Sequence, residues 1–248
     1  MAKLRQEIRR GLSKAQLRDY EKVLTAPALH LAPIRVKRED EIPLGASKLG
    51  GLPDLPPGRR WPQLSGTPLS FVAQIRLDDA RATLPSPCPW RLPRSGMLSF
   101  FVDDLAQVPR AIVMHVTLRR LTRRPVPADF AAANPGRVPY KASGVRMTRT
   151  ATVPAANHPV VVETLENRYA EAYAEHVRIV RPPAHQLLGF RNHPYDDDNP
   201  EDFQLLLRLV SDELAGMRWG DDEALDFFIK ESALKRGDFR RVFAYIGD

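Results

Sequence analysis

Residues 71–79 read FVAQIRLDD, a short apolar run that ends in two acids. The run is rich in β-forming residues and too short for a buried helix, so it predicts a central strand. The same pattern returns near the C-terminus, where residues 205–213 read LLLRLVSDE. The two stretches indicate that one structural unit occurs twice in the chain.

Two further pairs of predicted strands follow in the same order. LSFFVDD at 98–104 is matched by LDFFIKE at 225–231, and RAIVMH at 110–115 is matched by RRVFAY at 240–245. Three matching strands in one order favour an internal duplication. The alternative is that apolar strands resemble one another without common descent.

Helices are predicted outside these strands. Leu4, Ile8 and Leu12 stand four residues apart near the N-terminus, which indicates an amphipathic helix, or two short ones, within the first 24 residues. Apolar residues with the same spacing predict a second helix over residues 163–177. Residues 122–159 hold many turn residues and no periodic pattern, which predicts a loop.

The fold class that follows is α+β. It consists mainly of antiparallel sheets from two duplicated strand units, with the N-terminal and mid-chain helices packed outside. A chain of 248 residues is long enough to bury one sizeable core. We predict one domain with four segments, namely a helical lead-in, a first β unit, a connector with a helix and a second β unit, over residues 1–46, 47–121, 122–181 and 182–248.

The segment before the first strand is unusually rigid. SKLGGLPDLPPGRRWPQLSGTPLSFVAQIRL, residues 47–77, contains five prolines and four glycines. Prolines and glycines of this kind restrict the unfolded chain and shape tight corners next to a sheet. The same rigidity suits a binding loop, so the segment predicts either a corner or a site.

Composition points to a soluble, cytoplasmic protein. Hydrophobic content is 43% and charged content 27%, both ordinary values. No apolar run reaches the length of a membrane span, and the basic N-terminus lacks the apolar stretch of a signal peptide. Cys88 is the single cysteine, so no disulfide framework is expected.

Charge is distributed unevenly along the chain, whose net charge is +7. Residues 105–181 carry 12 Lys and Arg against 5 Asp and Glu, whereas residues 182–248 carry 8 against 14. Such asymmetry can steer a charged partner. It can equally come from two faces of the protein that neutralise each other.

An ordered string of motifs covers most of the chain from about residue 47. It runs KLGGLPDLPPGRRWP, GTPLSFVAQIRL, GMLSFFVDD, HQLLGF, LLLRLVSDE, MRWGDDEALDFFI and GDFRRVF. This string resembles the YwqG-like family. That family is a bacterial domain of unknown function, associated in part with toxin–immunity neighbourhoods. The resemblance implies a soluble bacterial intracellular protein and brings no established activity.

The chain departs from the family pattern at three positions. Val210 stands where the family has an acid before the serine, Glu223 stands where it has a glycine, and Asp226 stands where it has an aromatic residue. A metal or substrate role that depends on the missing acid is therefore not transferred to this chain.

Two acid-rich loops are candidates for chemistry. Residues 211–223 read SDELAGMRWGDDE and residues 195–202 read YDDDNPED. Clustered carboxylates can bind a hard cation or act as acid and base, but neither spacing fits a calcium loop. Acids at strand ends more often cap turns. The six histidines form no zinc motif, so we predict no metal and no cofactor.

Three classes of function remain open. The leading hypothesis is a protein-interaction module of the immunity type that binds a protein partner such as a toxin. The second is a small-molecule or nucleotide-processing enzyme that uses the acid-rich loops, although no catalytic motif is present. The third is nucleic-acid binding through the basic middle segment, where residues 119–124 read RRLTRR. Oligomeric state is not predicted.

The predicted binding residues come from both halves. In a duplicated sheet protein we expect equivalent loops to gather at one end, and the junction between the halves to be concave. Trp61, Gln74, Trp219 and Asp221 should then converge around one pocket. The alternative is that Gln74 bonds the backbone and both tryptophans fill the core. The full predicted set is Lys48, Arg60, Trp61, Gln74, Asp212, Trp219 and Asp221.

Overall fold

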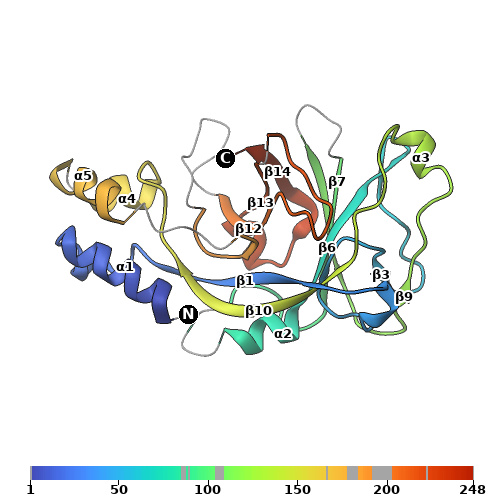
Figure 1. Ribbon diagram of the computed structural model, residues 1–248, viewed down its shortest axis with the longest axis horizontal. Coiled ribbons are helices and arrows are strands. Elements are labelled where there is room, and N and C mark those ends of the chain that lie inside the picture. The colour runs from blue at the N-terminus through green and yellow to red at the C-terminus, as the bar shows by residue number, and fades with distance from the viewer. Residues whose placement is uncertain are drawn as a thin grey trace.

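The computed structural model describes residues 2–84, 88, 90–103, 109–165, 167–177, 184–191, 203–221 and 223–247. The acidic segment at 195–202 lies outside these residues. The dominant element is a ten-stranded sheet with the strand order β14-β13-β12-β11-β1-β10-β2-β6-β7-β8. Neighbouring strands run antiparallel throughout. The two outer strands contact each other, so the sheet curls into a nearly closed barrel (Figure 1).

The predicted strands are confirmed, and both halves of the sheet have the same layout. β2, β6, β7 and β8 lie in this order on one side of the central strands, and β11, β12, β13 and β14 lie in this order on the other. Their bounds are Lys48–Leu49, Ser70–Arg76, Met97–Asp103 and Arg110–Val116, then Gln186–Leu187, Phe203–Val210, Ala224–Lys230 and Val242–Gly247.

The apolar faces of the two halves meet in one core. Phe100 of β7 packs on Phe227 of β13 with ring centroids 5.2 Å apart, and both side chains are fully buried. Phe100 and Phe227 belong to the L-x-F-F patterns that the sequence pairs, so the paired stretches occupy matching places. Whether they share a common origin stays a prediction.

The prediction that residues 122–159 form a loop is wrong for residues 143–152. Residues Ser143–Thr152 form the long strand β10, which pairs along its whole length with β1, Ala26–Arg35. These two strands run along the length of the molecule between the two halves (Figure 1). Most β10 side chains are only partly buried, and prolines interrupt β1, so neither strand has the apolar signature of the others.

Three of the helices pack together at one end of the molecule (Figure 1). α1, Ala2–Lys14, continues into the 3₁₀ helix η1, Arg18–Tyr20, which confirms the N-terminal prediction. The predicted mid-chain helix is two short helices, α4 and α5, Pro159–Thr164 and Asn167–His176. They share a separate apolar cluster with α1, built around Ile8, Leu12, Val161 and Tyr173.

The remaining elements are short. They are η2 (Glu39–Glu41), β3 (Asp54–Leu55), β4 (Gln63–Leu64), β5 (Thr67–Pro68), α2 (Leu77–Thr83), β9 (Thr122–Arg123), α3 (Phe130–Ala133), α6 (Glu231–Lys235) and η3 (Phe239–Arg241). β3 pairs with β9, and β4 pairs with β5. None of the described helices combines the length and apolarity that a membrane-spanning helix requires.

Candidate functional site

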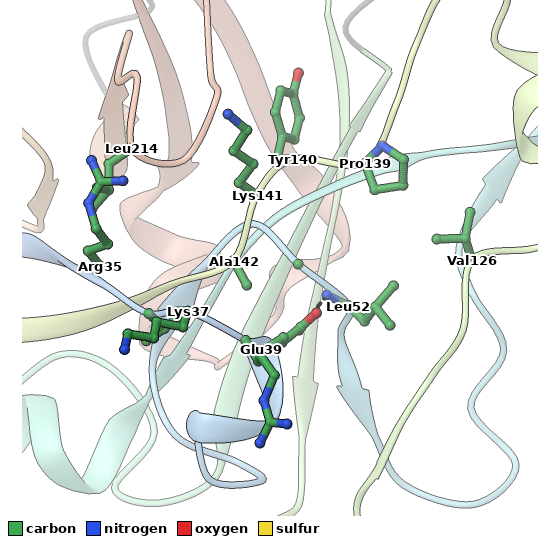
Figure 2. A pocket seen from close by; sticks show the side chains of 13 residues that line it. Arg35, Lys37, Glu39, Leu52, Val126, Pro139, Tyr140, Lys141, Ala142 and Leu214 are labelled. Carbon is green, nitrogen blue, oxygen red and sulfur yellow. Dashed lines mark hydrogen bonds between the residues drawn. The ribbon is translucent and has the colours of Figure 1, made fainter.

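A surface pocket of about 380 Å³ lies where β1 ends and β10 begins. Because Arg35 pairs with Ser143 across the two strands, the segments 35–39 and 139–142 leave the sheet side by side. Residues 51–52 of the rigid leader join them, and Val126 and Leu214 complete the lining (Figure 2). The leader therefore forms part of this pocket as well as a corner before β6.

The pocket is rimmed by four cations. Arg35, Lys37, Arg38 and Lys141 line it and are exposed. Arg38 pairs with Asp40 at 3.2 Å, between two side chains that are both mostly in water. Within the described chain the other three cations form no ion pair. The rim therefore carries three cations without an ion pair, beside the lining residue Glu39 and the Glu41 carboxylate, which accepts from the backbone N–H of Lys37 at 3.2 Å.

Tyr140 gives the pocket an aromatic wall. Figure 2 shows its ring next to the side chain of Lys141. The ring packs against the indole of Trp219, with centroids 5.4 Å apart and planes tilted by 58°. Trp219 is only 1% exposed and belongs to the main core. Tyr140 thus stands on a rigid support while remaining partly open to solvent.

A buried ion network lies beneath the pocket. Lys48 Nζ donates to Glu39 Oε1 at 2.9 Å and lies 3.4 Å from Asp54 Oδ1. Arg123 Nε donates to the same Asp54 oxygen at 2.9 Å. The side chains of Lys48 and Asp54 are fully buried. Two cations and two carboxylates thus compensate each other, as buried charges require.

Gln74 completes this network. Its Oε1 accepts from the backbone N–H of Asp54 at 3.0 Å, and its Nε2 donates to Asp54 Oδ2 at 2.8 Å and to the carbonyl of Ala46 at 2.7 Å. The alternative expectation, that Gln74 satisfies backbone groups inside the core, is confirmed. The amide ties the leader to β6.

The network shifts two pKa values. Burial raises the pKa of Asp54, but hydrogen bonds from Arg123, Gly45 and Gln74 and the charge of Lys48 outweigh it, so the pKa lies below its ordinary value. Burial lowers the pKa of Lys48, and the charges of Asp54 and Glu39 offset only part of that effect.

Two glycines of the leader permit this close packing. Gly50 and Gly51 have φ of +60° and +72°, a region that L-residues avoid. A Cβ at Gly50 would collide with the backbone carbonyl of Lys141, and one at Gly51 with the carboxylate of Glu39. The N–H of Gly51 donates to the carbonyl of Tyr140 at 2.8 Å. The glycines therefore fix the pocket floor against its wall.

The remaining predicted binding residues lie elsewhere. Trp61 packs on Phe101 and Phe130 at 5.8 and 6.4 Å between centroids, in a separate apolar cluster, and Arg60 beside it is exposed. Asp221 is exposed in the turn after Trp219. Although all of these residues are described, the structure does not gather Trp61, Gln74, Trp219 and Asp221 around one pocket. Gln74 and Trp219 are buried, and Trp61 belongs to a different cluster from Trp219.

Asp212 caps a turn. Its Oδ1 accepts from the N–H of Ala215 at 2.9 Å, and its Oδ2 lies 3.4 Å from Nε2 of the buried His185. Burial lowers the pKa of His185, and Asp212 only partly opposes this. The turn-capping expectation is confirmed for this acid. In the part of the chain that the structure describes, no three or more His, Cys, Asp or Glu side chains gather as a metal site would require.

Asp226, one of the departures from the family pattern, lies in a second buried cluster. Arg208 Nη1 donates to its Oδ2 at 2.8 Å, and Arg191 Nε lies 3.0 Å from the same oxygen. The Arg191 guanidinium also sits over the rings of Phe228 and Tyr245. Burial raises the pKa of Asp226 despite the two arginines. These contacts are structural and face no described pocket.

Sequence reasoning missed the residues that form the pocket rim. Arg35, Lys37 and Arg38 lie in the stretch IRVKRED, and Tyr140 and Lys141 lie in PYKASG. Both stretches hold clustered polar residues next to a strand end. The signal could be found only after β1 and β10 were paired, since that pairing brings the two stretches together.

Comparison with known proteins gives a family and no activity. Among curated proteins, none matches the chain. The domain of unknown function DUF1963 matches residues 47–246, which is most of the chain, and the protein therefore belongs to that family.

Proposed function

We propose that the protein is a protein-binding module that takes up an acidic segment of its partner in the basic pocket. The observation that carries this proposal is the presence of three exposed cations, Arg35, Lys37 and Lys141, that have no ionic partner within the described chain and face one pocket. Unpaired cations around a concave surface attract carboxylates and raise the association rate with an acidic partner.

The local structure suits such recognition. Leu52 and the glycines before it form a floor that the buried network of Lys48, Glu39 and Asp54 holds in place. A rigid site loses little conformational entropy when it binds. Tyr140 adds a supported aromatic surface, a kind of residue enriched in binding hot spots. The rim cations therefore attract an acidic segment, and the rigid floor gives the pocket a fixed shape.

An immunity-type role is the more specific form of this proposal. In that role the acidic segment belongs to a toxin, and binding covers the surface that the toxin needs. This form is supported by the resemblance to the YwqG-like family. That family is bacterial and intracellular, and it is associated in part with toxin–immunity neighbourhoods. We also propose that the two strand sets arose by duplication, since they have the same order in the sheet.

The basic run RRLTRR offers less support for nucleic-acid binding. Arg123 donates through Nη1 and Nη2 to the carbonyls of Glu39 and Ile42 and through Nε to Asp54. Arg124 donates to the carbonyl of Pro56 at 3.3 Å. Two of the four arginines are thus engaged within the fold and are not available to contact phosphates.

The test is binding of a fluorescein-labelled octaglutamate peptide at low salt. Substituting Arg35, Lys37, Arg38 and Lys141 together by Gln should weaken binding at least about tenfold, which corresponds to about 1.4 kcal/mol. Fluorescence anisotropy measures the dissociation constant, and circular dichroism checks that the variant remains folded.

In a control variant, four other exposed arginines are also replaced by Gln, namely Arg59, Arg60, Arg94 and Arg119. It should bind the peptide within about twofold of the wild type, because net charge alone is not the cause. Equal loss in both variants, or loss in neither, would contradict the proposal. Tight binding of a DNA duplex that only the control variant loses would favour the nucleic-acid alternative.

A further inference from the structure

A second cavity, of about 360 Å³, lies at the opposite end of β1. Ala26 and Pro27 line it at the start of the strand, whereas Arg35 of the basic pocket ends the strand. Pro27 and Arg35 are eight positions apart along an extended strand, a span of roughly 26 Å. The two sites are therefore distinct. The volume lies within the range of small-molecule pockets, about 300–1,000 Å³.

The walls of this cavity are mainly apolar. Side chains from four separate parts of the chain contribute, namely those of Leu84, Val160, Leu188, Phe190, Phe203 and Leu205. Leu84 and Leu188 are buried members of the main core, and Leu205 is buried as well. Burial of an apolar ligand against such walls is favourable in proportion to the area removed from water.

Arg91 is the main polar group of the cavity. Its Nη1 donates to Gln204 Oε1 at 2.9 Å and lies 3.5 Å from Glu231 Oε1. Within the described residues, Nε and Nη2 of Arg91 make no hydrogen bond. The side chain is 46% exposed, so these donors lie near the mouth. A guanidinium with open donors can bind a carboxylate.

Among the residues that the structure describes, the charge near the cavity is positive on balance. Glu231 is shared between Arg91 and Lys235, whose Nζ lies 3.0 Å from it. The guanidinium groups of Arg91 and Arg149 are both close enough to the Cys88 thiol to influence it. Burial, the larger effect, raises the pKa of that thiol, so it remains neutral and does not offset the two arginines.

We propose that this cavity binds a small, mostly apolar molecule that carries one carboxylate. The carboxylate bonds the open N–H groups of Arg91, and the apolar part lies among Leu188, Phe190 and Leu205. A medium-chain fatty acid or an aryl carboxylate has this chemistry.

Octanoate, octanol and octylamine serve as probes because they share one chain and differ in the charge of the head group. Cys88 is the only cysteine and lines the cavity, so its rate of modification by a maleimide reports occupancy. Octanoate should slow the modification at least about tenfold at saturation. Octanol should protect only at higher concentration, and octylamine should not protect.

Two variants make the test specific. Arg91→Gln should raise the half-protecting concentration of octanoate about tenfold and leave that of octanol unchanged. Arg110→Gln is the control, because Arg110 is also half-exposed and ion-paired, at 2.9 Å with Asp103 on β7, and should change neither. Val160→Trp should fill the cavity and reduce protection by octanoate and octanol alike.

Three results would overturn the proposal. The first is no protection of Cys88 by octanoate. The second is equal protection by octylamine, which would show that the carboxylate is not recognised. The third is an equal effect of Arg91→Gln and Arg110→Gln, which would show that net charge, and not the cavity, governs the labelling rate.

Discussion

Replacing Asp54 with Ala is expected to lower the free energy of unfolding by about 3–5 kcal/mol. The substitution removes the carboxylate that Arg123 and Lys48 share, and leaves the side chain of Lys48 fully buried with only Glu39 as counter-ion. It also removes the acceptor of the Gly45 N–H and one of the two acceptors of Gln74 Nε2, the other being the carbonyl of Ala46. Urea unfolding followed by circular dichroism measures the change.

Asp40→Ala is the matched control. Asp40 also pairs with an arginine, at 3.2 Å, but its side chain is 67% exposed and that of Arg38 is 75% exposed. Surface pairs of this kind contribute at most about 1 kcal/mol. A loss for Asp54→Ala no greater than that for Asp40→Ala would show that the buried network does not hold the pocket floor.

Acid should remove the stability that the Asp54 carboxylate contributes to the folded protein. The folded-state pKa of Asp54 lies below 3.8, so its stabilising contribution is complete above the pKa of the unfolded chain. It is lost as the pH falls through the folded pKa, because protonation breaks the pairs. The difference in stability between the wild type and Asp54→Asn should therefore shrink steadily below pH 3.8.

Replacing Trp219 with Ala is expected to cost about 3–5 kcal/mol of stability, because the side chain is almost fully buried in the main core. The cavity left behind would also remove the support on which the Tyr140 ring rests. We therefore expect weaker peptide binding by this variant even where it is folded. Urea unfolding and the anisotropy assay measure the two effects separately.

Trp219→Phe is the control for this prediction. The indole N–H of Trp219 makes no hydrogen bond within the described residues, so its removal leaves no partner unsatisfied. The loss should be smaller than for Trp219→Ala, because the phenyl ring fills part of the space that the indole occupies. A small loss for Trp219→Ala, with peptide binding reduced, would instead assign the indole a direct role in the site.

The apolar strands could be predicted from sequence because their signal is local. β6, β7, β12 and β13 are buried along nearly their whole length, so each reads as a continuous apolar run. β1 and β10 could not be predicted in the same way. Their side chains are mostly half-buried, and their stability comes from pairing with each other.

The candidate site could be predicted only in part, because its residues also come together through contacts between distant parts of the sequence. Gln74 stood out as a polar residue inside an apolar strand and Lys48 as a cation beside the leader glycines, and the structure places both in one buried network. Sequence alone could not supply their partners, because Arg123 lies 69 residues from Asp54. The pocket rim depends on the register of β1 with β10, which no local pattern encodes.

The central claim is that the basic pocket itself binds the acidic segment, and an NMR titration of the ¹⁵N-labelled protein with the octaglutamate peptide tests it most directly. The largest amide shift changes should occur at residues 35–39, 51–52 and 139–142, and they should disappear when Arg35, Lys37, Arg38 and Lys141 are replaced by Gln. Largest changes at 119–124 or at the basic turn 236–241, with the pocket amides unmoved, would contradict the claim.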